Sequence, residues 1–231
     1  PRTIAVDALP EAAEALNQAL NQARGSAVHL YVPQRGDVAK LVNMAYTNAV
    51  ERLARESGRY AREEKLLEEL AQLLGMEKAP AVIESYDISN WGDGTSVCGM
   101  VVFENGKPKR AGYRRFKMRT VARTDDYASM AEALSRRAAE YAKGAPGQFG
   151  VLPDLILLDG GRGQVNAVRQ AIAGTELARV PLFGMVKDDH HRTRAIVTGE
   201  GREIAINLNR GVFTFVTAIQ DEVHRFAITY Q

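Results

Sequence analysis

The sequence predicts an α/β fold, a mixed β-sheet flanked by helices and preceded by a helix-rich N-terminal region. After residue 80, alternating and near-continuous apolar runs have the lengths of strands, and segments with helical periodicity separate several of them. Before residue 75, apolar residues recur mainly at helical spacing. The chain has 231 residues, 45% hydrophobic and 25% charged, which suits one large or two small globular domains.

The first 79 residues form the helix-rich region, which we expect to be a helix-strand-helix half-domain or scaffold. The pattern is rich in Ala and Leu, and Gly75 stands where a glycine commonly ends a helix. The segment Met76–Pro80 is typical of a linker, so the second domain is expected over residues 80–231. The expected elements are helices over Glu11–Arg24, Asp37–Ser57 and Tyr60–Leu74 and a strand over Ala27–Pro33.

Residues 80–231 contain two groups of strand patterns that differ in their connections. Three strands joined by hairpins come first, and two near-continuous apolar runs, typical of buried central strands, follow. The expected elements are strands over Val82–Ile88, Thr95–Phe103 and Lys109–Lys117, a helix over Asp126–Lys143, a loop over Gly144–Gly150, a strand over Asp154–Leu158, a helix over Gly163–Ile172, a strand over Pro181–Val186, a hairpin over Ala195–Ile206 and a helix over Val212–Ile228. This order is that of an RNase H-like mixed sheet.

Composition excludes several classes of protein and site. The lone cysteine, Cys98, excludes an intrachain disulfide and fits a reducing cytoplasm, and no Cys/His spacing resembles a zinc site. The longest apolar runs fall far short of the ~20 residues that span a bilayer, so we expect no membrane segment. The start at Pro1, without the apolar core of a signal peptide, leads us to expect a fragment of a longer cytoplasmic protein.

Two aspartates follow strand patterns at positions where chemistry is expected. Asp87 ends the first strand among apolar neighbours, where a carboxylate is costly to bury unless it caps backbone amides or binds a metal. Asp159 ends an apolar run before Gly160-Gly161-Arg162-Gly163, at the carboxyl edge where open sheets place ligands. The glycines also suit a phosphate cradle, and the two roles are compatible. No G-x-x-x-x-G-K-[ST] loop occurs, which disfavours an ATPase.

His224 and Asp126 are less specific candidates. His224 lies in the last helix beside its apolar stripe, where a structural histidine is the commoner outcome, and Asp221 one turn earlier is placed to orient its ring. Asp125 and Asp126 open a helix, where aspartates usually cap amides. Two carboxylates and an imidazole together would form a hard-ligand site for Mg²⁺ or Mn²⁺, which activates water and neutralises charge at a phosphate.

Basic residues gather in two stretches, although the net charge is only +2. Residues 107–123 contain eight Lys and Arg and no acidic residue, which suits a phosphate backbone. The segment 187–194 follows a buried strand on the same expected edge, where a solvated loop is the simpler alternative to phosphate contacts. The residues expected to bind DNA are Arg114, Arg115, Lys117, Arg162, Lys187, Arg192 and Arg194.

Six sequence blocks occur in order across the second domain. They are Tyr86-Asp87-Ile88-Ser89, Tyr113-Arg114-Arg115-Phe116, Asp125-Asp126-Tyr127, Leu157-Leu158-Asp159-Gly160-Gly161-Arg162-Gly163-Gln164, Lys187-Asp188-Asp189-His190-His191-Arg192-Thr193-Arg194 and Asp221-Glu222-Val223-His224-Arg225-Phe226-Ala227. In these blocks the chain resembles the C-terminal half of the UvrC family, the incision subunit of the bacterial UvrABC nucleotide excision repair system.

The resemblance implies an RNase H-like endonuclease that incises DNA on the 5′ side of a lesion with a divalent metal, Mg²⁺ or Mn²⁺. The family's Asp-Asp-His catalytic and metal-binding set falls on Asp87, Asp159 and His224, and a further acidic position falls on Asp126. The implied partners are damaged double-stranded DNA and UvrB, whose binding motif has no counterpart in this segment. Two alternatives remain open: an endonuclease V-like repair nuclease, and a non-catalytic DNA-binding module on the same fold.

Overall fold

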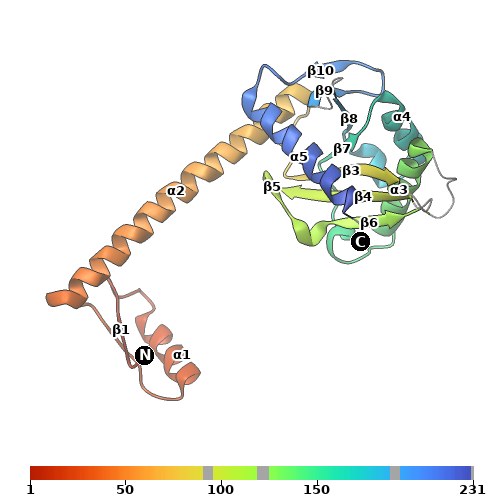
Figure 1. Cartoon of the computed structure of the whole chain (residues 1–231). Coiled ribbons are helices and arrows are strands. Elements are labelled where there is room, and N and C mark those ends of the chain that lie inside the picture. Colours follow the sequence, from red (N-terminus) through yellow and green to blue (C-terminus); the bar gives the residue numbers. More distant parts are fainter. Residues whose placement is uncertain (91–95, 119–124, 188–192, 230–231) are drawn as a thin grey trace. The chain divides into compact units, whose positions relative to one another are not determined.

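The computed structural model describes residues 1–90, 96–118, 125–187 and 193–229. The chain divides into two compact units, Pro1–Ala61 and Arg62–Gln231 (Figure 1). The expected domain boundary between residues 79 and 80 stays a prediction. Within the described residues, no helix combines the length and the apolar character needed to cross a membrane.

The first unit is a small β-α-β arrangement followed by the start of a long helix. β1 (Thr3–Ala5) pairs in parallel with β2 (His29–Tyr31), and α1 (Ala13–Arg24) lies between them in the sequence. α1 ends at Gly25, whose φ of 73° is a left-handed conformation that glycine adopts at low cost. The helix and the second strand agree with the predictions, whereas β1 is too short to show a periodic pattern.

One helix, α2 (Gly36–Leu74, 39 residues), occupies the region where the sequence predicts two helices separated near Gly58. That predicted break is wrong. A glycine inside a helix costs only about 1 kcal/mol relative to alanine, so a single Gly58 does not interrupt a long run of good helix formers. The helix ends at Gly75, which has a φ of 70°, as expected.

The second unit is built on a mixed sheet. Its strands are β3 (Val82–Asn90), β4 (Ser96–Glu104), β5 (Lys107–Pro108), β6 (Arg114–Lys117), β7 (Leu155–Asp159), β8 (Leu182–Lys187), β9 (Thr193–Val197) and β10 (Glu203–Ala205). The strand order is β10-β9-β8-β7-β3-β4-β5, and β6 also pairs with β4 (Figure 1). β3, β7 and β8 are parallel neighbours, whereas β4 is antiparallel to β3.

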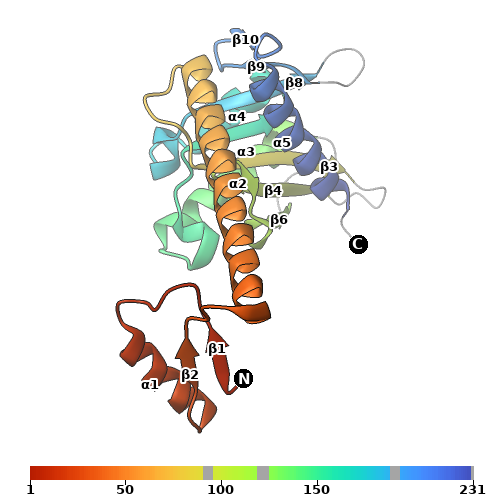
Figure 2. The same ribbon diagram turned by 90° about the vertical axis from the view of Figure 1, so that its left-hand side faces the viewer.

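Helices cover both faces of this sheet. Successive residues of a strand point to opposite faces, and apolar side chains on each face pack against helices. They are α3 (Asp126–Ala142), α4 (Arg162–Ala171) and α5 (Arg210–Ile228). α3 and α4 pack on the face that carries Tyr86 and Leu158. α5 and the last turns of α2 pack on the other face, against Ile83 and Leu157 (Figure 2). The predicted mixed sheet flanked by helices is therefore confirmed.

The third predicted strand, Lys109–Lys117, is wrong in its first half. β5 ends at Pro108, although the Lys109 amide still donates to the Val102 carbonyl at 2.7 Å, and the chain then forms the 3-10 turn Arg110–Gly112 before β6 begins. The other predicted elements of this unit occur within a few residues of their expected ends. Short 3-10 turns lie at Arg110–Gly112, Gly147–Gly150 and Glu176–Arg179.

Candidate metal centre

Two neighbouring parallel strands place Asp87 and Asp159 side by side. The register pairs Tyr86 of β3 with Leu158 of β7, so the next residue of each strand is one of the aspartates. Because side chains alternate between faces, both carboxylates lie on the face opposite Tyr86 and Leu158, which is the face that α5 covers. Two neighbouring strands thus carry a pair of adjacent carboxylates. β7 ends at Asp159, whereas β3 continues past Asp87 to Asn90, beyond its expected end at Ile88.

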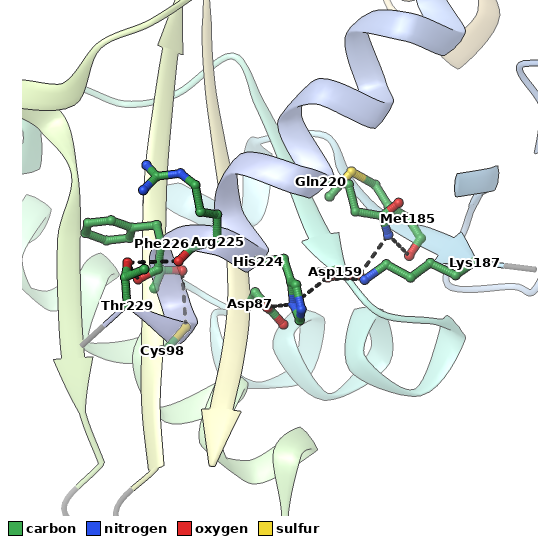
Figure 3. A network of polar contacts seen from close by, with 11 residues as sticks. Asp87, Cys98, Asp159, Met185, Lys187, Gln220, His224, Arg225, Phe226 and Thr229 are labelled. Carbon is green, nitrogen blue, oxygen red and sulfur yellow. Dashed lines mark hydrogen bonds and ion pairs between the residues drawn. The ribbon is translucent and has the colours of Figure 1, made fainter. Parts of the chain in front are cut away.

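α5 brings the imidazole of His224 to this pair (Figure 3). His224 Nδ1 lies 2.9 Å from Asp87 Oδ2 and 4.0 Å from Asp159 Oδ2. One ligand atom from each of the three residues lies within 4.8 Å of the others. The structure therefore brings together the three residues that the sequence suggests as ligands. The hydrogen-bond partner of Nδ1 is Asp87, rather than Asp221 as the sequence suggests.

A glycine on the neighbouring strand lets α5 lie close to the sheet. Gly99 of β4 pairs with Asp87, and a Cβ on Gly99 would lie 3.1 Å from the Cα of Ala227. That separation is shorter than the about 3.5–4.0 Å at which two carbon atoms attract best. Since Ala227 follows His224 by nearly one turn, the packing of Ala227 on Gly99 sets how closely the imidazole approaches Asp87.

The electrostatic setting of the carboxylates is unfavourable for two negative charges. Asp87 is only 7% exposed. Its burial, and then the charge of Asp159, raise the pKa of Asp87 from 3.8 to about 6, and the hydrogen bond with His224 opposes this rise only in part. Lys187 of β8 places its Nζ 2.9 Å from Asp159 Oδ2. Above pH 6 the pair therefore favours a further cation, because buried charges need partners or a metal.

The interpretation of the sequence missed one residue of this polar network. Gln220 of α5 is fully buried, and its Nε2 donates to Asp159 Oδ1 at 2.8 Å (Figure 3). The sequence does contain a signal for this residue. Gln220 is a glutamine one helical turn from both Val216 and His224, on the side of the helix that faces the core. A buried amide requires hydrogen-bond partners, so its place indicates a polar group on the sheet.

Asp126 lies at the start of α3, outside the cluster of ligand atoms found among the described residues. Its Oδ1 accepts a hydrogen bond from Asn90 Nδ2 at 2.8 Å, and Asn90 ends the strand that carries Asp87. Asp125 accepts from the Ala128 amide at 3.0 Å, which is the expected helix cap. A catalytic role for Asp126 stays a prediction.

Arg115 and Arg194, which are predicted to bind DNA, already have protein partners. Arg115 Nη2 donates to the carbonyl of Phe226 at 2.9 Å, and the guanidinium lies 3.8 Å from the centre of that ring. Arg115 thereby holds the last turn of α5. Arg194 forms an ion pair with Glu203 at 2.6 Å across the β9–β10 hairpin. DNA would have to share or displace these contacts.

The remaining predicted DNA-binding residues differ in exposure. Arg114 is partly buried and donates to two backbone carbonyls at 2.8 and 2.7 Å. Lys117 and Arg162 are exposed, and Arg162 is the first residue of α4, close in sequence to Asp159. Arg192 and the end of the basic stretch, 119–123, lie outside the described residues. Roles in DNA binding stay predictions for the whole set.

The donor set fits a divalent cation. Carboxylate oxygens and imidazole nitrogen are ligands that Mn²⁺ accepts, and carboxylates are the protein ligands that Mg²⁺ prefers. The raised pKa of Asp87 results from burial next to a like charge, and a bound cation would favour the ionised form instead. The described residues therefore offer a site that a divalent ion would stabilise.

The chain matches two family models. Residues 71–228 match the UvrC RNAse H endonuclease domain, and residues 1–56 match the UvrC Ribonuclease H-like domain. The first match covers more than half of the chain and includes Asp87, Asp159 and His224. Both units of the chain are therefore similar to parts of one family.

Curated relatives named UvrABC system protein C are similar over nearly the whole chain. The protein of Acetivibrio thermocellus is 43% identical over 94% of the chain. Those of Alkaliphilus oremlandii and Ruminiclostridium cellulolyticum are 42% and 44% identical over 100% of it. The chain spans only 37% to 39% of the length of these relatives.

Solved structures are more distant. Ciona intestinalis endonuclease V in complex with inosine-containing DNA has a TM-score of 0.36 and 16% identity, covering 60% of this chain and 58% of that one. Human ENDOV has a TM-score of 0.37 and 10% identity, covering 75% and 98%. These similarities are too low to support an inference about function. The family models and the identity to curated relatives establish that the chain belongs to the UvrC family and contains its RNase H endonuclease domain.

Proposed function

We propose that the second unit hydrolyses DNA phosphodiester bonds with a divalent metal, Mg²⁺ or Mn²⁺, as an endonuclease of bacterial nucleotide excision repair. The observation that most supports this is the proximity of Asp87, Asp159 and His224, whose ligand atoms lie within 4.8 Å of one another. Membership of the UvrC family supports DNA as the substrate. Incision on the 5′ side of a lesion and action together with UvrB are further proposals that rest on the family alone.

The two aspartates hold the metal in this proposal, and the bound ion supplies water activation and charge neutralisation at the phosphate. His224 directs Nδ1 at Asp87 Oδ2. Because an ionised carboxylate only accepts hydrogen bonds, Nδ1 carries a proton, and in the neutral imidazole Nε2 then has the lone pair. The side chain is 52% exposed, so this lone pair can accept a proton from water. As a metal ligand, His224 would use the same lone pair.

Basic residues near the aspartates are proposed to hold DNA phosphates. Arg162 follows Asp159 at the start of α4, and Lys187 contacts Asp159 directly. Exposed Lys117 and partly buried Arg114 extend the charge along β6. Such contacts position the backbone without reading its sequence, and they give binding that weakens as salt rises.

A cutting assay on end-labelled duplex DNA tests the proposal. Cutting should require Mg²⁺ or Mn²⁺, stop with EDTA, and be lost in Asp87→Asn and Asp159→Asn. Asp154→Asn is the matched control, because this exposed carboxylate accepts a hydrogen bond from the Val82 amide in the same sheet. Retained cutting by Asp87→Asn would refute the assigned site.

Two substrates distinguish the rival functions. Cutting beside a bulky adduct supports the excision-repair proposal, whereas preference for a deaminated base would favour an endonuclease V-like activity. Because the chain spans less than two fifths of its relatives, Mn²⁺ binding by calorimetry is measured in parallel. Failure to bind Mn²⁺, or binding that Asp87→Ala leaves unchanged, would favour a non-catalytic DNA-binding module.

A further inference from the structure

Gln220 is a polar side chain within the buried face of α5. It is fully buried, as are Val216 and Val223 on the same helix. Burial of an amide without hydrogen bonds costs on the order of 1–3 kcal/mol judged from protein mutants. Its contacts with neighbouring groups therefore explain why a glutamine is tolerated at this position.

The surroundings of Gln220 determine which way its amide points. Nε2 donates to Asp159 Oδ1 at 2.8 Å and to the Met185 carbonyl at 3.2 Å. Both partners only accept hydrogen bonds, so they require the NH₂ group on their side. On the opposite side, the hydroxyl of Thr193 donates to Gln220 Oε1. The amide therefore has one satisfactory orientation, held from β8 and β9.

The spacing of α5 explains how one helix serves both aspartates. Gln220 and His224 are four residues apart, about 6 Å along a helix at about 1.5 Å per residue. Neighbouring strands are about 4.8 Å apart, a similar distance. Gln220 contacts Asp159 of β7, and His224 contacts Asp87 of β3. Successive turns of α5 thus place one polar group on each of two adjacent strands.

We propose that Gln220 is a positioning residue that determines which oxygen of Asp159 is presented to the metal, an inference that rests on the proposed function. The Gln220 amide occupies Oδ1. That leaves Oδ2 directed toward the site, where it lies 4.0 Å from His224 Nδ1 and 2.9 Å from Lys187 Nζ. Without the amide, the carboxylate of Asp159 loses the contact that fixes Oδ1 and keeps only the ion pair of Oδ2 with Lys187, so metal affinity falls because the ligand is less firmly oriented.

Calorimetric titration with Mn²⁺ of the 231-residue chain and of its Gln220→Met variant tests this role. The methionine keeps the length of the side chain and removes the amide. Loss of a group that orients a ligand typically costs about 10- to 100-fold in metal affinity, and we expect a loss of that size. The matched control is Gln148→Met, which changes a buried glutamine beside Glu84 and Arg137. Gln148→Met should leave the Mn²⁺ affinity within twofold of the unmodified chain.

Thermal unfolding in EDTA shows whether each variant is folded. If Gln220→Met does not fold, Gln220→Leu takes its place under the same criterion, because it also removes the donor to Asp159 and adds no charge beside the site. An Mn²⁺ affinity within twofold of the unmodified chain in a folded Gln220 variant overturns the positioning role and leaves the proposed function standing. If the unmodified chain binds no Mn²⁺, both the proposed function and this role are overturned.

Discussion

Substitution of Asp87 by asparagine should stabilise the metal-free protein while removing its activity. The pKa of Asp87 rises from 3.8 to about 6 in the folded state. This rise of about two in pKa corresponds to about 3 kcal/mol at about 1.36 kcal/mol per pKa unit. Asparagine has nearly the same shape and carries no charge next to Asp159, so the variant should recover part of that free energy.

The sign of the pH dependence follows from the direction of the shift. A carboxylate whose pKa is higher in the folded state disfavours folding when it is ionised. This penalty is complete above pH 6 and disappears as pH falls below 3.8. Asp87→Asn should therefore exceed the unmodified chain in free energy of unfolding by about 1–3 kcal/mol at pH 8, with the difference shrinking toward pH 4.

Urea denaturation in EDTA at pH 4, 6 and 8 measures this difference. The control variant Asp154→Asn, at an exposed carboxylate, should show no gain at pH 8. Mn²⁺ at about 1,000 times its Kd should reverse the order, since it stabilises the unmodified chain by about 4.1 kcal/mol. An Asp87→Asn variant less stable than the unmodified chain at pH 8 in EDTA would refute the reasoning, because burial next to Asp159 would then carry no cost.

Three further outcomes are expected. Mn²⁺ affinity in calorimetry should fall by up to about tenfold per pH unit below pH 6, because the metal must displace the proton from Asp87. Lys187→Met should strengthen Mn²⁺ binding, since it removes the ammonium group from Asp159 Oδ2, and it should weaken DNA binding in a filter assay. An unchanged Mn²⁺ affinity would contradict competition between Lys187 and the metal for Asp159. Gly99→Ala should cost about 1–3 kcal/mol in denaturation, because the new Cβ forces Ala227 and α5 away from the sheet, and a neutral effect would show that the helix yields freely.

Hydrophobic patterns predict the central strands well, because these strands are buried on both faces. Their apolar runs leave few alternatives, and Asp159 stands out as the residue where such a run stops before glycines. The long helix α2 and the turn after Pro108 were predicted less well. A single Gly58 does not interrupt the long run of helix formers in α2, and the 3-10 turn Arg110–Gly112 is too short to show a periodic pattern.

Local sequence patterns predict the residues of the site only in part. A lone helical histidine has no signature of its own, and the sequence indicates His224 chiefly through the family resemblance. What brings it to Asp87 is the close packing of Ala227 on Gly99, a tertiary contact that no local pattern records. Local patterns do not indicate Gln220 for a related reason. Its role depends on partners from β7, β8 and β9, and within the buried face of α5 it is a single polar residue.

The packing of α5 explains how the carboxylate pair is kept in place without a metal. The raised pKa of Asp87 corresponds to a net cost of about 3 kcal/mol for its ionised form, in which burial and the charge of Asp159 outweigh the favourable contacts with His224 and Lys187. Val216, Ile219 and Val223 of α5 are fully buried in the same core, and each contributes about 1.5–3 kcal/mol. Their sum exceeds this net cost, so moving α5 away from the aspartates would lose more free energy than it relieves. The helix that carries His224 and Gln220 is therefore held over the aspartates by its apolar residues, and the site is preorganised before a cation binds.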